Sequence, residues 1–483
     1  MKLILIALIT LAAVAASATE NKNIVCYVGT WATYRTGKGK FDVEHIDPNL
    51  CTHLMYSFFG INDKGEFRVI DAYLDLEENW GKGNIKKFNA LKQVNPKLKT
   101  LAAVGGWNEG SIKFSEAAKD PIKRRTFIET SIEFALKHNF DGIDMDWEYP
   151  AQRGGDVEVD KANFVIWMKE FKEELEKHGL ILTTAVAAAE FSASQSYDIP
   201  NISKYFDLIN IMAYDLHGTW DETTGINAPL YPGPNDVTVT QQQLNVHSCV
   251  QYWLKQGAPA HKIVLGVPLY GRTFALANAA ENKPGSRFYG PGQAGPYTRQ
   301  AGFLGYNEIC DNFKTQSWTQ VWESTQQVPY AFNGNQWVGY DDVKSIELKT
   351  RYANKYKLGG IMVWSLETDD FNGVCGEKYP LMKAINRVLG DGSIPPNPPT
   401  TQAPITDPTT AAPNPTPPPG PEFKCTENGT FRDPYDCAVF YICNNNLKHS
   451  FRCADDLWFD IKTSTCNFKN LVDCKPLPIP PNY

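Results

Sequence analysis

Short apolar runs alternate with amphipathic stretches over most of the first 390 residues. Eight runs have the length of a strand, and between several of them apolar residues recur with the period of a helix, as in 122–138 and 161–178. The runs are 24–31, 53–61, 100–107, 140–147, 182–188, 208–214, 263–270 and 360–366. Eight strands joined by helical crossovers predict an α/β fold in which a parallel sheet closes on itself as a (β/α)8 TIM barrel.

The spacing of the runs is interrupted once, between the seventh and the eighth. About ninety residues separate them, too many for one crossover helix, and the segment is rich in Gly, Asn and aromatic residues. We therefore expect an inserted small α+β subdomain at about 274–350. Residues 391–421 are mostly Pro, Thr, Asn and Gly, which predicts an extended linker. The barrel should thus occupy 19–390, and a separate small β module 422–483.

The N-terminus and the cysteines indicate a secreted protein. Lys2, an apolar stretch and the small residues 16–18 have the pattern of a signal peptide, predicted at 1–18. This stretch is too short to span a membrane. Of the 11 cysteines, those after residue 420 suit a three-disulfide framework, whose pairing the spacing leaves open. Sequons at Asn201 and Asn428 are candidate glycosylation sites.

The overall charge argues against nucleic acid as a partner. The net charge is -7 at pH 7, whereas nucleic-acid-binding domains are usually basic. An acidic chain with 12 Trp fits a neutral polymer, because aromatic rings pack on the apolar faces of sugars. Ordinary core packing accounts for many of these rings.

Residues 141–148 carry acids at alternating positions. Asp144, Asp146 and Glu148 alternate with the apolar Met145 and Trp147. On a strand the three acids would form one row about 7 Å apart, opposite an apolar face. Buried carboxyls this close cannot all ionise without cost, so at least one pKa should rise. A carboxyl that stays protonated near neutral pH is what general-acid cleavage of a glycosidic bond requires. The alternatives are a solvated strand face and a cation site, and a cation site would need more oxygen ligands from loops.

Acidic and aromatic residues also recur where the other predicted strands end. In a (β/α)8 barrel these carboxyl ends form one mouth, where the active site lies. Aromatic rings with a few carboxylates at such a mouth suit a sugar ligand. The residues at these ends include Trp31, Phe58, Gly106, Trp107, Asp146, Glu148, Met212, Tyr214, Asp215, Tyr270, Arg272 and Trp364.

These residues resemble the family 18 glycoside hydrolases, the chitinase family. The DxxDxDxE signature of that family is met in full at 141–148, and the resemblance covers essentially all of 22–390. Further matching motifs, each on its own strand, are 103–107, 212–215, 270–272 and 362–365. One departure is Ala103, where the family often has Ser.

The resemblance implies a retaining, substrate-assisted mechanism, an exception to the usual pair of enzyme carboxylates. Glu148 would protonate the glycosidic oxygen, and the substrate's own acetamido carbonyl would attack C1. Asp146 would bond the acetamido N–H, Asp144 would share a proton with Asp146, and Tyr214 would bond the acetamido oxygen. No cofactor or metal is implied. The implied substrate-binding residues are Tyr27, Trp31, Phe58, Gly106, Trp107, Met212, Asp215, Tyr270, Arg272 and Trp364.

The C-terminal segment resembles a peritrophin-A type (family 14) chitin-binding module. Phe440, Tyr441 and Phe459 should form its small core, because so small a module has few other apolar residues. Trp458 is then the candidate sugar-binding residue. The resemblance implies the disulfides Cys425–Cys443, Cys437–Cys474 and Cys453–Cys466 in the module. In the barrel it implies Cys26–Cys51 and Cys310–Cys375, with Cys249 left free.

The sequence therefore predicts a secreted, extracellular and monomeric endochitinase that acts on chitin and chito-oligosaccharides, with no nucleic-acid or membrane partner. One alternative is a lectin of the same family that binds chitin without cutting it. Such lectins typically lack the acid at the position of Glu148, which is present here. A second alternative is an endo-β-N-acetylglucosaminidase acting on N-glycans, for which a chitin-binding module would have no use.

Overall fold

The computed structural model describes residues 22–390 and parts of the C-terminal module, namely 429–433, 436–444, 447–453, 457–461, 465–468 and 472. The predicted signal peptide, the linker and the sequon at Asn428 lie outside the described residues. Within the described ranges, no helix is both long and apolar enough to cross a membrane.

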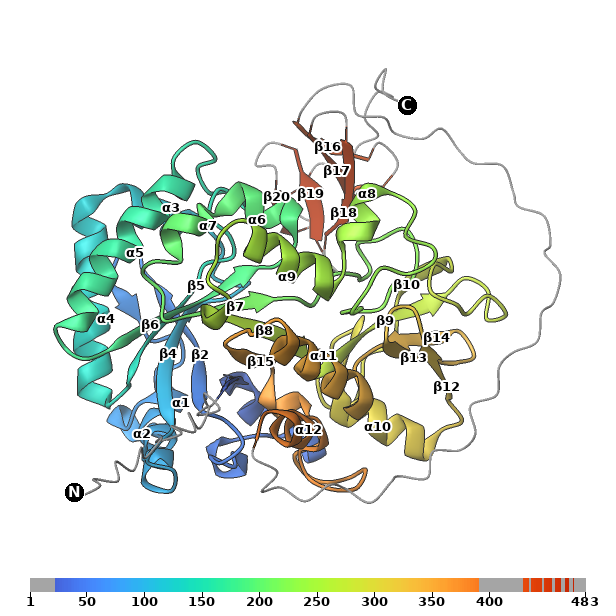
Figure 1. Cartoon of the computed structure of the whole chain (residues 1–483), viewed down its shortest axis with the longest axis horizontal. Helices are drawn as coiled ribbons and strands as arrows, with labels where there is room; N and C mark the ends of the chain where they lie inside the picture. Colours follow the sequence, from blue (N-terminus) through green and yellow to red (C-terminus); the bar gives the residue numbers. More distant parts are fainter. Residues whose placement is uncertain are drawn as a thin grey trace, which may run out of the picture.

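Eight parallel strands close into a barrel (Figure 1). β1 pairs with β2 on one side and with β15 on the other, so the sheet has no free edge at this point. The prediction of a (β/α)8 barrel is confirmed, and each strand overlaps the apolar run that predicted it. The strands are β1 (Asn23–Gly29), β2 (His53–Ile61), β4 (Lys99–Gly105), β5 (Gly142–Asp146), β6 (Ile181–Ala187), β7 (Leu208–Met212), β8 (Ile263–Pro268) and β15 (Gly360–Trp364).

Helices cover the outside of the barrel. The two helices expected from periodicity are present, and α4 has clear end signals. It begins with Pro121 at its first position, Asp120 accepts the N–H of Ile122 at 2.8 Å, and Asn139 closes the helix in the left-handed region. The helices are α1 (Ala72–Asp75), α2 (Asn84–Ala90), α3 (Ile112–Lys119), α4 (Pro121–His138), α5 (Asp160–Glu176), α6 (Glu190–Ser196), α7 (Ile199–Ile202), α8 (Val239–Gln243), α9 (Val246–Lys255), α10 (Tyr306–Thr315), α11 (Val343–Lys355) and α12 (Pro380–Leu389).

An antiparallel sheet is inserted between β8 and β15 and lies beside the barrel (Figure 1). The insertion is shifted from the expected 274–350. It begins at Tyr270, because the chain leaves the barrel after Pro268 and turns directly into β9. It ends before α11, which packs on α12 and β15 and so belongs to the barrel. Its strands are β9 (Tyr270–Leu276), β10 (Phe288–Pro291), β11 (Phe303–Gly305), β12 (Thr319–Glu323), β13 (Val328–Asn333) and β14 (Gln336–Gly339).

The apolar side of β5 anchors the acid row in the core. Ile143 and Met145 are fully buried. Trp147 stacks on Phe114 at 5.7 Å between ring centroids and meets Phe164 edge-on at 5.7 Å. The apolar residues of 143–147 therefore pack outward, as the alternation predicted. This arrangement sends Asp144 and Asp146 toward the inside of the barrel.

Two disulfides are described, one within the barrel and one that joins α10 of the insertion to the segment after β15. They join Cys26 to Cys51 and Cys310 to Cys375, the pairs that the resemblance implies, and Cys249 is free and buried. In the module, Cys437, Cys443 and Cys453 are each disulfide-bonded. The half-cystines expected to pair with them lie outside the residues or side chains that the structure describes, so that pairing stays a prediction.

The described part of the C-terminal module is antiparallel. β16 (Gly429–Arg432), β17 (Val439–Asn444) and β18 (Leu447–Arg452) form one sheet, and β19 (Leu457–Asp460) pairs with β20 (Thr465–Phe468). Phe440 stacks on Phe459 at 4.2 Å between centroids, and Phe459 is buried. These two rings belong to the small core, as expected. Trp458 is half-buried in β19.

Candidate active site

A wide groove opens at the carboxyl ends of the barrel strands. It gathers ten predicted residues at the ends of six barrel strands and two from the start of the insertion. The predicted residues Asp144, Gly106 and Trp458 do not line it. The predicted residues that do line it are Tyr27, Trp31, Phe58, Trp107, Asp146, Glu148, Met212, Tyr214, Asp215, Tyr270, Arg272 and Trp364.

Asp144 is at the closed end of the acid row and is fully buried. Tyr27 donates its hydroxyl to one carboxyl oxygen at 2.6 Å, and Thr183 donates to the other at 2.6 Å. Burial raises the pKa of Asp144 to about 6, although these hydrogen bonds oppose the rise. Both oxygens of Asp144 accept from hydroxyl groups, and the sharing of a proton with Asp146 stays a prediction.

Asp146 is the middle acid and lies at the last position of β5. Its Oδ1 is buried and has no hydrogen-bond partner. Burial, followed by the nearby charges of Glu148 and Asp144, raises the pKa of Asp146 well above its usual range. A buried carboxyl oxygen without a partner is costly, so this position is prepared to receive a donor from a ligand.

Glu148 is at the open end of the row, two residues beyond the end of β5, and 9% of its surface is exposed. Burial raises the pKa of Glu148 to about 7, and the charge of Arg153 partly offsets this rise. Glu148 thus combines contact with the groove and a carboxyl that holds a proton near neutral pH. These are the two properties a general acid needs.

Arg153 is a site residue that sequence reasoning missed. Its guanidinium lies 3.6 Å from the centroid of the Trp107 ring, and one Nη donates to the carbonyl oxygens of Trp107 at 2.8 Å and Glu148 at 2.9 Å. It therefore fastens the Glu148 backbone to the exposed indole at the rim. The only feature of the sequence that could have indicated Arg153 as a site residue is its position five residues after Glu148.

Three aromatic rings form one wall of the groove. Phe58 stacks on Trp364 at 5.7 Å, with 20° between the ring planes, and Trp31 stacks on Phe58 at 6.3 Å. Gly106 is required behind this wall, because a Cβ at its φ of +80° would lie 2.6 Å from the Phe58 ring. The wall presents flat apolar faces of the kind that pack against sugar rings.

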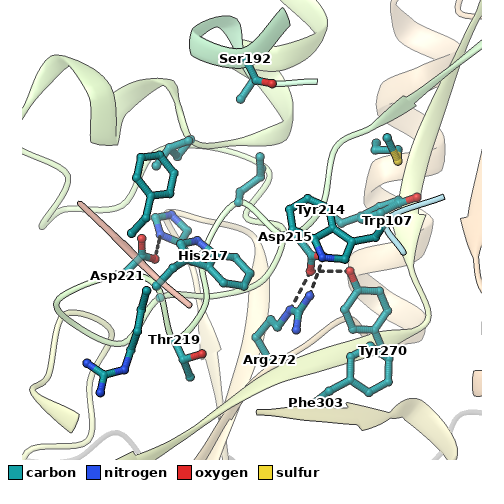
Figure 2. Close-up of a pocket in the computed structure, with 18 of the residues that line it drawn as sticks. Trp107, Ser192, Tyr214, Asp215, His217, Thr219, Asp221, Tyr270, Arg272 and Phe303 are labelled. Carbon is teal, nitrogen blue, oxygen red and sulfur yellow. Dashed lines mark hydrogen bonds and ion pairs between the residues drawn. The ribbon is translucent and has the colours of Figure 1, made fainter. Parts of the chain in front are cut away.

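Asp215 is at the centre of a second cluster, just beyond the end of β7, which lies two strands from β5 in the barrel (Figure 2). Arg272 donates to both of its oxygens, at 2.7 Å and 2.6 Å, and the Tyr270 hydroxyl donates at 2.6 Å. Burial alone would lower the pKa of Arg272, but the Asp215 carboxylate raises it. Tyr214 lies beside this cluster, with its hydroxyl 3.7 Å from the sulfur of Met362, a weak acceptor.

Asn227 supports the second cluster from below and was also missed. It is fully buried. Its Oδ1 accepts the backbone N–H of Asp215 at 2.9 Å, and its Nδ2 donates to the carbonyl of Tyr270 at 3.2 Å. A single amide thus fixes two predicted sugar-binding residues. Because Asn227 lies in a loop between predicted strands, no periodicity marked it.

His217 and Asp221 form a further pair at the groove, with the ring nitrogen 3.1 Å from the carboxylate (Figure 2). Among the described residues, the side chains of Cys310, Asp370 and Cys375 lie close enough together to hold one metal ion. The two cysteines form a disulfide, however, so their thiols are not free to bind a metal. Asn201 lies on α7 with its amide donating to Asp198 at 2.7 Å, and its glycosylation stays a prediction.

A (β/α)8 barrel with buried carboxyls of raised pKa beside stacked aromatic rings suits a glycoside-cleaving enzyme. The comparison with known families agrees: the model of the glycosyl hydrolases family 18 matches residues 23–369. The chain belongs to this family. The chitin binding Peritrophin-A domain matches residues 425–474, so the chain also carries a chitin-binding module.

Curated relatives and solved structures support this assignment. The chain is 41% identical over 398 residues to "Probable chitinase 2" of Drosophila melanogaster, and the matched region covers 76% of this chain and 80% of that protein. It is 37% identical to "Chitotriosidase-1" of Mus musculus, with 92% of this chain and 95% of that protein covered. The crystal structure of the Ostrinia furnacalis Group IV chitinase in complex with allosamidin has a TM-score of 0.75 at 50% identity, covering 77% of this chain and 100% of that one.

Proposed function

We propose that this chain is a secreted chitinase that hydrolyses polymers of β-1,4-linked N-acetylglucosamine with retention of configuration. The observation that carries the proposal is Glu148, a carboxyl that reaches the groove and whose pKa is raised to about 7 by burial. The protein is proposed to act as an extracellular monomer on chitin and chito-oligosaccharides.

The first chemical step breaks the glycosidic bond. Glu148 gives its proton to the glycosidic oxygen, so the departing sugar leaves as a neutral alcohol. The carbonyl oxygen of the substrate's 2-acetamido group forms a bond to C1 as the C1–O bond breaks. The product is a cyclic oxazolinium ion on the sugar, and Glu148 is left as a carboxylate.

The second step restores the enzyme. Glu148, now a base, takes a proton from water as the water oxygen attacks C1 and the oxazolinium ring opens. Two inversions at C1 give net retention. Glu148 is protonated again at the end of the cycle, ready for the next bond.

The other residues of the row support the acetamido group. Asp146 accepts its N–H, which fits the unpartnered buried oxygen at this position. Tyr214 donates to its carbonyl oxygen and so directs that oxygen toward C1. Asp144, held by Tyr27 and Thr183, shares a proton with Asp146, whose pKa the nearby charge of Asp144 helps to raise.

The groove residues bind the sugar chain around the reacting bond. Trp364 forms the floor beneath the reacting sugar, with Phe58 and Gly106 behind it, and Trp31 and Trp107 extend the groove. In the second cluster, Tyr270 and Arg272 bind sugar polar groups and Asp215 helps to distort the ring. Met212 contributes a further substrate contact.

The C-terminal module is proposed to hold the enzyme on insoluble chitin, with Trp458 as its sugar-binding ring. A linked second site raises the local concentration of the barrel on the polymer. Deletion of residues 391–483 should therefore reduce the rate on insoluble chitin more than the rate on soluble oligomers. An equal loss on both substrates would refute the anchoring role.

A single incubation tests the main proposal. The secreted chain is mixed with chitin hexamer, and the products are followed by mass and by anomeric configuration. The proposal expects shorter chito-oligosaccharides whose new ends are initially β. Binding of the hexamer without any cleavage would support the lectin alternative instead, and initial α-anomers would overturn the substrate-assisted mechanism.

A further inference from the structure

His217 and Asp221 lie in the loop that follows the second cluster, and neither takes part in the steps of hydrolysis. The loop, residues 216–226, begins directly after Asp215, and most of its residues line the groove. We call it the groove loop. His217 is only 9% exposed within it, so the surroundings of its ring are set by the loop itself.

The groove loop is anchored at both ends. At its start, the N–H of Leu216 donates to the carbonyl of Asn227 at 3.0 Å. Near its end, the N–H of Thr224 donates to the carbonyl of Ser286 in the insertion at 2.8 Å. The tip of the loop, residues 217–223, lies between these two anchors.

His217 closes the tip from the inside. Its Nδ1 lies 3.1 Å from Oδ2 of Asp221, and the same oxygen accepts the N–H of Gly218 at 3.2 Å (Figure 2). A Cβ at Gly225 would lie 2.5 Å from the His217 ring, so a glycine is required there. The imidazole therefore fills a closely fitted space between the two arms of the loop.

Both partners of the His217 ring are acceptors. One is the carboxylate of Asp221, and the other is the backbone carbonyl of Leu244, directly after α8. A neutral imidazole has one N–H and cannot donate to both, whereas an imidazolium can. Burial alone would lower the pKa of His217, but the hydrogen bond to Asp221 and the charges of Asp221 and Asp236 raise it. The closed loop therefore favours a His217 that is protonated on both nitrogens.

The tip brings Trp220 to the second cluster. The Arg272 guanidinium lies 5.0 Å from the centroid of the Trp220 ring, and it donates to both oxygens of Asp215. The rings of Tyr270 and Phe303 each lie 5.6 Å from the same guanidinium. Trp220 thus covers the cation that orients Asp215, and the position of Trp220 depends on the tip of the groove loop.

We propose that the His217–Asp221 pair is a latch that holds Trp220 against Arg272, closed while His217 is protonated and loosened when His217 is neutral. His217 is then a positioning residue for the second cluster, a role that rests on the proposed function. Because the pKa of His217 is raised above its ordinary value of 6.5, the latch is closed below pH 6.5. It is lost as the pH rises through the raised pKa.

The first test measures the binding of chitin tetramer by calorimetry, in a Glu148→Gln background so that cleavage does not alter the substrate. With His217 present, the affinity should fall by about threefold to tenfold as the pH rises from about 6 to about 8.5. His217→Gln should have the weaker affinity already at the lower pH, so the fall disappears. Glu222→Gln, at an exposed acid of the same loop, is the matched control and should keep the fall of its parent. An equal fall with and without His217 would overturn the proposal.

The second test needs no substrate. The His217 ring is titrated by NMR in the full chain, and its signals are identified by their absence in His217→Gln. Its pKa should lie above 6.5 and should drop by about 1 in Asp221→Asn, which removes the charge but keeps the shape. A pKa at or below 6.5, or one that Asp221→Asn leaves unchanged, would also overturn the proposal. Failure of the unmodified chain to hydrolyse the tetramer would instead contradict the proposed function, and the titration would still decide the latch.

Discussion

Two groups of carboxyls lie at the mouth of the barrel, at the ends of β5 and β7, and their surroundings differ. On β5, the side chains of Asp144 and Asp146 are buried and have uncharged hydrogen-bond partners or none, and burial raises the pKa of each. Just beyond β7, the exposed Asp215 receives two hydrogen bonds from Arg272 and one from Tyr270. The first group thus retains protons, and the second pairs its carboxylate with a cation.

The difference shows how one groove can hold carboxyls for two purposes. A buried carboxyl without a cation is easier to protonate, which suits the transfer of a proton to a leaving group. A carboxylate in a two-pronged contact with arginine has a fixed orientation, which suits the binding of a sugar in one pose. Glu148 is intermediate between a carboxyl without a cation and one paired with arginine. The charge of Arg153 lowers the pKa of Glu148, but the hydrogen bond from Arg153 goes to the backbone oxygen of Glu148.

The largest effect is expected from Glu148→Gln, which removes the proton but keeps the shape. Turnover of chitin tetramer should fall by about 10²- to 10⁴-fold, while binding of the oligomer is largely kept. Glu222→Gln, at an exposed acid that also lines the groove, is the matched control and should retain activity. Steady-state kinetics and calorimetric binding provide the readouts, and near-normal turnover in Glu148→Gln would remove the basis of the mechanism.

A smaller effect is expected from Asp215→Asn in the second cluster. The change removes the charge that pairs with Arg272 but keeps the proton donor Glu148. We expect kcat/KM to fall by about tenfold to a hundredfold, mainly through KM, because hydrogen bonds to charged groups are lost. If kcat/KM fell as much as in Glu148→Gln, and only through kcat, the two groups of carboxyls would not have the different roles described.

Asn227→Ala should have a milder effect of the same kind. The loss of its two hydrogen bonds loosens Asp215 and Tyr270 together, so KM should rise about fivefold, with kcat less affected. Asn235→Ala is the control, since Asn235 is an exposed asparagine at the same groove. If both variants behave alike, Asn227 does not position the cluster.

The smallest effect is a shift in pH dependence in Arg153→Gln. The positive charge of Arg153 lowers the pKa of Glu148, so its removal should raise that pKa. The fall in rate on the alkaline side should then move to higher pH. A profile that moves to lower pH, or that does not move, would show that Arg153 does not act on the charge of Glu148.

The barrel and the acid row could be predicted from sequence because both depend on local alternation. Eight apolar runs gave the eight strands, and the spacing of Asp144, Asp146 and Glu148 placed the first two on one face of β5. What the alternation could not give was contact between distant segments. Thr183 on β6 and the loop residues Arg153 and Asn227 act through bonds to residues on other elements. Neither a single polar residue in an apolar run nor one in a loop carries a periodic signal that marks its partner.

The first residue of the insertion could not be predicted from the apolar pattern either. Pro268 and Tyr270 both fall at the end of one apolar run, so the run alone could not separate the last barrel residue from the first residue of β9.

The central claim is that burial keeps Glu148 protonated as the acid. The most direct test is kcat/KM for chitin tetramer as a function of pH in the unmodified chain. Because the acid must hold its proton, the rate should be high below the pKa of Glu148 and fall as the pH rises through about 7. A rate that stays constant up to about pH 9 would contradict the account.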